Sequence, residues 1–281
     1  MMKYKKLCLW ILLLLFIPAL SFCQYYYKDI AGTRITTDQL KVFKTNRIKK
    51  VVLNSFEANG EPSDKFICYQ EISPSFNVIK TFTQSVQTLQ SVMNSQFNFK
   101  GQLIRNSDSS NTTLNVTSYT YDANGRLVLT ESVSQAYAYN FKETEKHQWI
   151  YDSTGFPVLM YQIKNNRDTV EVSFIPDEKG NVAVETWKTK GKVTLNYYYY
   201  YDELNRLTDV VRYNSRAKRL LPDYIFEYDE KSQLIQMISV QAGSSNYVIW
   251  RYQYNAQGLK TKAVIYNKQK ELMGYITYKN E

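Results

Sequence analysis

The sequence predicts an all-β protein, a repetitive antiparallel β-hairpin meander that forms a curled or spiral sheet. Three observations favour this fold: a turn motif that returns at a nearly constant spacing, period-two alternation of apolar residues between the turns, and a composition with 25 Tyr and 13 Phe against 6 Pro and 10 Gly. Aromatic residues suit the pleated, half-buried surface of a sheet. Because its apolar face must leave water, we expect the sheet to curl on itself, close into a barrel-like or spiral shell, or stack against another layer.

The motif is clearest in residues 197–207, YYYYYDELNRL. Tyr199 and Tyr201 are two residues apart and therefore project from the same face of a strand. Asp202 stands where its carboxylate can accept hydrogen bonds from the backbone N–H groups that follow and close an Asx-type turn. Asn205 occupies the position that needs a positive φ, for which Gly is best suited and Asn next best. The unit therefore predicts a β-hairpin.

Copies of this unit run along most of the chain. The turn residues that we expect to fix them are Asp122 with Gly125, Asp152 with Gly155, Asp177 with Gly180, Asp202 with Asn205, Asp229 with Ser232, and Asn255 with Gly258. Residues 97–103 and 56–62 are weaker copies, and Ser232 should be mildly strained. The acidic or amide positions 98, 122, 152, 177, 202, 229 and 255 are 24 to 30 residues apart. Such a spacing is typical of a repeat architecture, here with two strands per copy.

The chain begins like an exported protein. Three lysines within the first six residues precede an apolar run at residues 7–17, which is too short to span a membrane as a helix. This layout predicts a signal peptide over residues 1–23 with cleavage after Cys23. Lipid attachment at Cys23 is the alternative, although the bulky Phe22 replaces the small residue that usually precedes a lipidated cysteine. We therefore expect a secreted, periplasmic or cell-envelope protein without a transmembrane helix after cleavage.

Two regions follow the predicted signal peptide. Residues 24–47 form an N-terminal segment whose structure the sequence leaves open, although residues 37–38 can cap a short helix that ends at Val42. Residues 48–281 form the repeat-containing β domain. Within it, residues 81–93 fit either a helical face or two strands around a polar loop, and the flanking repeats favour two strands.

The composition limits the kinds of site that the chain can build. Removal of the signal peptide lowers the formal net charge from +9 to +6 and leaves Cys68 without a second cysteine for a disulfide. His147 is the only histidine, so a histidine-based metal site or a Cys–His pair has little to build on. We interpret His147 as a strand residue on the face of Trp149 and Tyr151, and Cys68 as a small apolar residue. No cofactor and no metal are expected.

The repeated acids invite a catalytic interpretation. They are candidates for calcium ligands or for a glycosidase carboxylate pair, which would have to face one another across a cleft. Each acid, however, stands where its own turn needs a cap, and that role already explains it. The acids in question are Asp122, Asp152, Asp177, Asp202 and Asp229. No catalytic residue is assigned.

A candidate binding surface consists of Tyr198, Tyr200 and Tyr247. Alternation places Tyr198 and Tyr200 opposite the core row of aromatics, and tyrosine faces stack on sugars, so a glycan is the ligand that they indicate. Packing between strands is the alternative. The basic excess fits an acidic polymer or an anionic envelope surface, or lysines that protect sheet edges. Nucleic acid is not expected as the partner of an exported chain.

The motif resembles the YD repeat of RHS (rearrangement hot spot) proteins, in which an aromatic-Tyr-Asp is followed by a turn glycine and Arg-Leu. Residues 121–127 match it closely, and residues 201–207 match with Asn for Gly. The resemblance covers residues 97–254 well and implies a spiralling antiparallel sheet, which in large members encloses a toxic C-terminal domain. This chain has fewer repeats, no stretch like their self-cleaving segment, and no expected toxin domain after residues 272–278. It looks more like the short exported YD-repeat proteins, for which no general activity is known.

We therefore expect an exported or envelope-associated YD-repeat protein with a structural or binding role toward an envelope glycan or protein, and no catalysis. One alternative is a shell fragment or accessory partner of an RHS-type toxin system. A carboxylate-dependent hydrolase is the second alternative and ranks last.

Overall fold

The computed structural model describes residues 25–86, 90–139, 141–214, 217–240 and 245–281, so the predicted signal peptide lies outside the described residues. A π-helical turn, η3 (Tyr26–Ala31), leads directly into α1 (Gly32–Thr45). The strands are β1 (Lys50–Glu57), β2 (Ile67–Ile72), β3 (Val78–Gln84), β4 (Ser91–Phe97), β5 (Leu103–Ser110), β6 (Thr113–Tyr121), β7 (Leu127–Ala136), β8 (Phe141–Tyr151), β9 (Pro157–Lys164), β10 (Asp168–Pro176), β11 (Val182–Thr189), β12 (Lys192–Tyr201), β13 (Leu207–Asn214), β14 (Arg219–Tyr228), β15 (Leu234–Val240), β16 (Tyr247–Tyr254), β17 (Lys260–Tyr266) and β18 (Leu272–Asn280), with a 3-10 turn, η4 (Tyr137–Tyr139), between β7 and β8.

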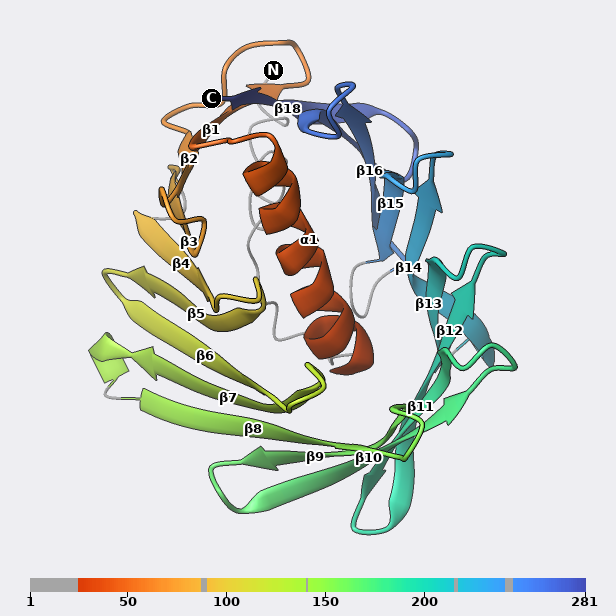
Figure 1. Cartoon of the computed structure of the whole chain (residues 1–281). Helices are drawn as coiled ribbons and strands as arrows, with labels where there is room; N and C mark the ends of the chain where they lie inside the picture. Colours follow the sequence, from red (N-terminus) through yellow and green to blue (C-terminus); the bar gives the residue numbers. More distant parts are fainter. Residues whose placement is uncertain (1–24, 87–89, 140, 215–216, 241–244) are drawn as a thin grey trace.

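The eighteen strands of the described residues form one sheet that closes into a barrel (Figure 1). Each strand pairs with the next in antiparallel fashion, and β1 also pairs with β18, from Val51 opposite Asn280 to Glu57 opposite Gly274. The predicted all-β antiparallel meander is confirmed. The curled or spiral sheet is wrong, because the barrel is closed. Closure gives the backbone groups of β1 and β18 partners that an open sheet would leave exposed at its two edges.

The predicted repeat turns lie at one end of the barrel, since they join every second pair of strands, from β4–β5 to β16–β17. A β-bulge accompanies each turn at the second aromatic position; Tyr121, for example, pairs with Leu127 after a shift in register. A bulge adds one residue to one strand and increases its local twist. The repeat therefore places its irregularity at the same height on successive hairpins.

The phase of the first repeat differs from the sequence prediction. Residues 56–62 do form the expected kind of turn, in which the Gly60 N–H donates to the Glu57 carbonyl at 2.9 Å, but this turn joins β1 to β2 at the opposite end. The copy that is in phase is residues 73–77, where the Ser73 hydroxyl accepts the Asn77 N–H at 3.1 Å. Ser in place of the acid hides this copy from the sequence motif.

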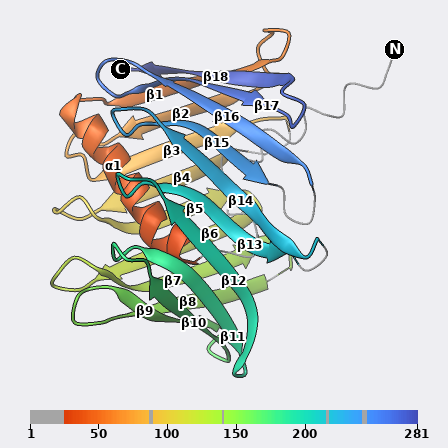
Figure 2. The same ribbon diagram turned by 90° about the vertical axis from the view of Figure 1, so that its right-hand side faces the viewer.

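The N-terminal segment fills the barrel. Helix α1 lies across the end that carries the repeat turns (Figures 1 and 2), and just beyond it the Asn46 side chain donates to the Gln257 carbonyl at 3.3 Å. Leu40 and Phe43 on its inner face pack with residues of β1–β5 and β16–β18. Residues 25–31, which we call the strap, run deeper and pack with β7–β14. The apolar face of the sheet is therefore covered by the chain's own N-terminal segment.

Two local predictions meet the structure here. The helix is longer than the predicted one: it begins at Gly32, not at residues 37–38, and its N-cap Ala31 makes no side-chain capping bond. Packing in the barrel, and not a local cap, therefore determines where it starts. Residues 81–93 belong to two strands, β3 and β4. None of the helices in the described ranges is long and apolar enough to cross a membrane.

Candidate functional site

Each repeat turn is closed by its own acidic or amide residue. After β12, Asp202 Oδ1 accepts hydrogen bonds from the N–H groups of Leu204 at 3.0 Å and Arg206 at 2.9 Å, and Asn205 has a φ of 59°. In the other turns the first residue accepts the N–H four residues later and the fourth residue has a positive φ: Asn98 with Gly101, Asp122 with Gly125, Asp152 with Gly155, Asp177 with Gly180, Asp229 with Ser232, and Asn255 with Gly258.

The turn carboxylates are committed to these hydrogen bonds. The Arg126 backbone N–H holds the pKa of Asp122 below its usual range, and the Thr154 hydroxyl, followed by the Phe156 N–H, does the same for Asp152. A carboxylate that caps a turn in its ionised form is a poor general base, because its acceptor sites are occupied. The geometry therefore places these acids in turn capping.

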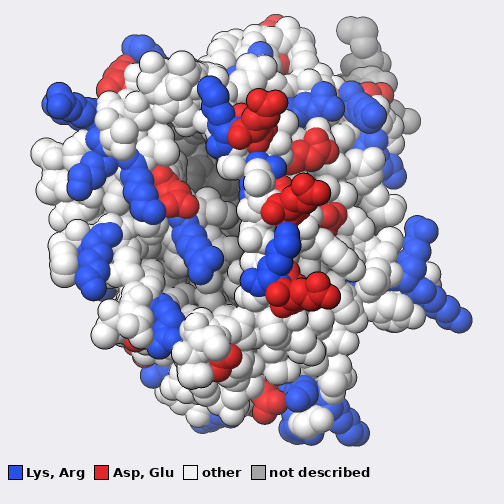
Figure 3. Space-filling view, turned by 45° about the vertical axis from the view of Figure 1, so that its right-hand side comes forward, with Lys and Arg blue, Asp and Glu red and all other residues white. Residues whose placement is uncertain are grey.

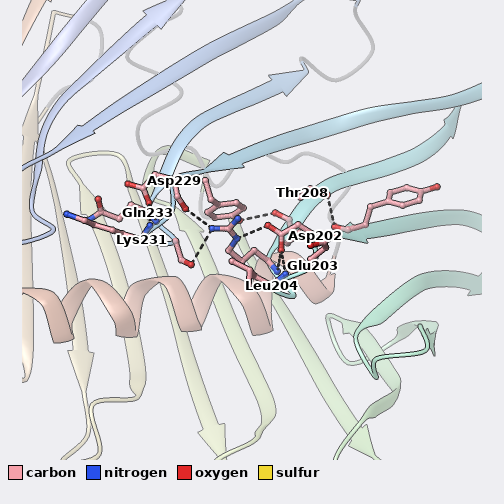
Figure 4. A network of polar contacts seen from close by, with 12 residues as sticks. Asp202, Glu203, Leu204, Thr208, Asp229, Lys231 and Gln233 are labelled. Atoms are coloured by element: carbon pink, nitrogen blue, oxygen red, sulfur yellow. Dashed lines mark hydrogen bonds and ion pairs between the residues drawn. The ribbon is translucent and has the colours of Figure 1, made fainter.

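Neighbouring turns are joined by the residue that follows the positive-φ position. Arg206 Nε pairs with Asp202 Oδ2 at 2.7 Å, and its Nη1 donates across the rim to the Asp229 carbonyl at 2.8 Å (Figure 4). Its guanidinium also lies 4.9 Å from the centre of the Tyr228 ring. Arg126 repeats the contact, 4.9 Å from the Tyr151 ring. A cation over an aromatic face stabilises the pair, so the motif arginine links one repeat to the next.

The second aromatic of the motif links successive repeats inside the barrel. Tyr228 Oη donates to the Leu207 carbonyl at 2.9 Å, which connects the Tyr of one copy to the last apolar residue of the preceding copy. The same bond, at 2.8 to 3.0 Å, is made by Tyr121 to Leu103, Tyr151 to Leu127, Tyr201 to Val182 and Tyr254 to Leu234. The conspicuous Tyr and Leu of the motif therefore have a structural explanation.

The rim of the barrel is strongly charged. Three consecutive turns carry Asp–Glu pairs, at 177–178, 202–203 and 229–230, and acidic side chains gather beside a hollow on the face that carries these turns (Figure 3). An open groove of about 370 Å³ lies between two of the turns and is lined by Asp229, Lys231 and Asn255. Within the described residues, no three His, Cys, Asp or Glu side chains are placed to hold a metal ion.

The candidate tyrosines do not form a single surface. Tyr198 and Tyr200 project from the outer face of β12, where Tyr200 is 47% exposed, and they border an open groove of about 460 Å³ with Asp177, Lys179 and Val184. Tyr247 lies on β16 near the opposite end, and its hydroxyl donates to the Lys268 carbonyl at 3.3 Å. The structure thus leaves Tyr198 and Tyr200 as a pair and separates Tyr247 from them.

A buried carboxylate in the lumen binds the strap. Glu185 of β11 is 0% exposed, and it accepts the backbone N–H groups of Tyr25 at 2.9 Å and Tyr26 at 3.1 Å. The Trp187 indole N–H and the Tyr199 hydroxyl also donate to it, each at 2.6 Å. All four partners are donors, so the ionised form of the carboxylate satisfies them.

A second anchor reverses these roles, with the carboxylate on the strap and the donors on the barrel. Asp29 Oδ2 lies 2.6 Å from His147 Nδ1 and accepts the Trp149 indole N–H at 3.2 Å. The other ring nitrogen of His147 lies 2.7 Å from Glu145 Oε1. The ring is thus held between two carboxylates.

This arrangement keeps His147 charged. Burial alone would lower the pKa of His147, but the charges and hydrogen bonds of Asp29 and Glu145 outweigh it and raise this pKa to about 9. Burial likewise raises the pKa of Glu145, yet its bond to His147 brings it down to about 2. An imidazolium that donates from both nitrogens has no free lone pair to act as a general base. The triad is an ion-pair anchor.

The sequence interpretation put His147 on the face of Trp149 and Tyr151, where it does lie, but it missed the partner on the strap. Glu185 was not singled out at all. The available signal was parity, since Glu185 shares a strand face with Trp187 and a charged residue in a core row calls for a partner. Asp29 lies in a segment whose structure the sequence left open.

No protein-family model and no curated protein matches this chain. Among solved structures it is similar to the Tc holotoxin pore of Photorhabdus luminescens, at 15% identity over 76% of this chain and 12% of that chain, with a TM-score of 0.35. It is also similar to a TcdB2–TccC3–Cdc42 complex, at 14% identity over 77% of this chain and 12% of that chain, with a TM-score of 0.35. A porin-like protein from Bacteroides uniformis shares 10% identity over 83% of this chain and 96% of that chain, with a TM-score of 0.42. The chain thus spans a small part of the toxin chains and nearly the whole length of the porin-like protein.

Proposed function

We propose that this chain is an exported or envelope-associated protein of the YD-repeat type that binds an envelope glycan through the outer groove beside Tyr198 and Tyr200. The groove is the observation that carries the proposal. It combines two tyrosines on the outer face with polar side chains at one end, Asp177 and Lys179, which are the two kinds of contact that a sugar uses. Aromatic side chains present a large apolar face at little entropic cost.

The absence of catalysis is part of the proposal. The turn acids are occupied as caps, and His147 is held between two carboxylates. Burial raises the pKa of the Cys68 thiol to about 11, so at neutral pH this cysteine is a thiol and not a nucleophilic thiolate. Each group that commonly performs chemistry therefore already has a structural role.

A shell or accessory role in an RHS-type toxin system receives less support. The resemblance implies a shell whose interior holds cargo, whereas here α1 and the strap occupy the lumen. An accessory role would therefore use the outside of the barrel. Co-purification of the exported protein with a toxic polypeptide is the observation that would favour this alternative over glycan binding.

A glycan array tests the proposed function with three proteins. We expect the exported wild-type chain to bind a bacterial envelope glycan and the Tyr198→Ala plus Tyr200→Ala variant to lose about tenfold or more in affinity, or at least 1.4 kcal/mol. Tyr213→Ala is the matched control, because Tyr213 lies on the next strand, is 51% exposed and does not line the groove. Equal binding by the double variant, or no binding by the wild type, would refute the proposal.

A further inference from the structure

The two anchors of the strap differ in charge balance. Asp29 has a cationic partner in His147, whereas Glu185 has none among the Lys, Arg and His residues that the structure describes. Its four hydrogen bonds favour the ionised carboxylate, but burial opposes that form and raises its pKa. A buried carboxylate without an opposite charge is expensive. The lumen therefore has a place for one more positive charge.

The donors to Glu185 indicate where that charge would come from. Two of them are the consecutive backbone N–H groups of Tyr25 and Tyr26, and the predicted cleavage after Cys23 puts a new α-amino group on Gln24. Neighbouring Cα atoms are about 3.8 Å apart, so this amine is one residue from the carboxylate. A free α-amino group has an ordinary pKa of about 7.7–8.0 and is mainly cationic at neutral pH.

We propose that proteolytic cleavage within one residue of Tyr25 frees an α-ammonium group that pairs with Glu185 and locks the strap in the barrel. An endopeptidase hydrolyses the peptide bond with one water molecule, which leaves the new carboxylate on the departing segment and the amine on the barrel chain. Tyr25 is 3% exposed, so the peptidase acts before the strap enters the lumen. Export processing is therefore coupled to completion of the fold, independently of what the outer groove binds.

The first test identifies the mature N-terminus and its reactivity. The protein is purified from cells that export it, mass spectrometry locates its first residue, and a brief treatment with an acylating reagent compares the α-amine with the exposed Lys41 of the same molecule. We expect the chain to begin at Gln24 or Tyr25. We also expect Glu185→Gln to raise the acylation rate of the α-amine about tenfold or more relative to Lys41, since one unit of pKa is a factor of ten.

Two further variants complete the experiment. Glu171→Gln is the matched control, because Glu171 is a carboxylate on the adjacent strand β10 that pairs with Lys188 outside the lumen, and it should leave the amine as unreactive as in the wild type. If Glu185→Gln does not fold, two glycines inserted before Gln24 displace the amine while Glu185 stays intact. This insertion should expose the amine and lower the melting temperature by about 5 °C. A first residue elsewhere, a blocked α-amine, or equal reactivity in every variant would overturn the proposal.

Discussion

The wall of the barrel and the strap inside it are held in opposite ways. In the wall, each turn acid binds residues two to four positions away, and the same bonds recur from copy to copy. The strap is bound by contacts between residues 118 to 160 positions apart, and each of these occurs once. Repetition makes the wall tolerant of a single lost contact. The strap has no spare anchor, so we expect the most damaging single substitutions there.

Removal of the His147 cation should give the largest effect. His147→Gln leaves the carboxylates of Asp29 and Glu145 without the charge between them. Breaking a buried ion pair by removing one partner costs about 3–5 kcal/mol, so the free energy of unfolding measured with urea should fall by that amount.

The matched control for this substitution is Lys146→Ala, on the same strand but facing outward. Lys146 pairs with Glu131 at 3.0 Å, and both side chains are more than one-third exposed. An exposed pair contributes about 0–1 kcal/mol. If the two substitutions cost the same, the strap anchor is no stronger than a surface contact and the comparison fails.

The pH dependence of stability should show the same anchor from another side. The folded-state pKa of His147 is raised from 6.5 to about 9, so its stabilisation is complete below pH 6.5 and is lost as the pH rises through 9. The shift corresponds to about 3 kcal/mol. Glu145 is depressed from 4.5 to about 2, and its part is lost as the pH falls from 4.5 toward 2. Urea unfolding should therefore give a maximum between pH 4.5 and 6.5, and the alkaline slope should be much shallower in His147→Gln.

The seam between β1 and β18 is the part of the wall that is not repeated. A Cβ on Gly274 would lie 2.6 Å from the Phe56 carbonyl oxygen, so Gly274→Ala must push the two strands apart. We expect a loss of about 1–3 kcal/mol, as for other overpacked sites. Gly32→Ala at the start of α1 is the control, because its nearest atom would be 3.5 Å away. A neutral Gly274→Ala would mean that the seam adjusts freely and does not need glycine.

The same division between local and distant contacts explains how much could be predicted from sequence. The hairpin turns follow from bonds within five residues, so Asp202 and Asn205 already indicate their geometry. Closure depends on β1 meeting β18, which no local pattern encodes. The lumen site was missed because Glu185 reads as an ordinary polar residue of an alternating strand. Its partners, Tyr25 and Tyr26, lie in the segment with the weakest sequence signal.

The smallest expected effect tests whether the turns of the wall are equivalent. Ser232 has a φ of 60°, a conformation that costs a residue with a Cβ about 1–2 kcal/mol and glycine almost nothing. Ser232→Gly gives up the exposed contact from Arg206 Nη1 at 3.3 Å and should still raise the free energy of unfolding by about 0.5–1 kcal/mol. The reverse change, Gly155→Ser at a φ of 88°, should lower it by a similar amount. If the two changes are mirror images, the turns act as interchangeable units. If only one turn responds, its contacts with the neighbouring repeat decide its stability, and the wall is less uniform than its motif.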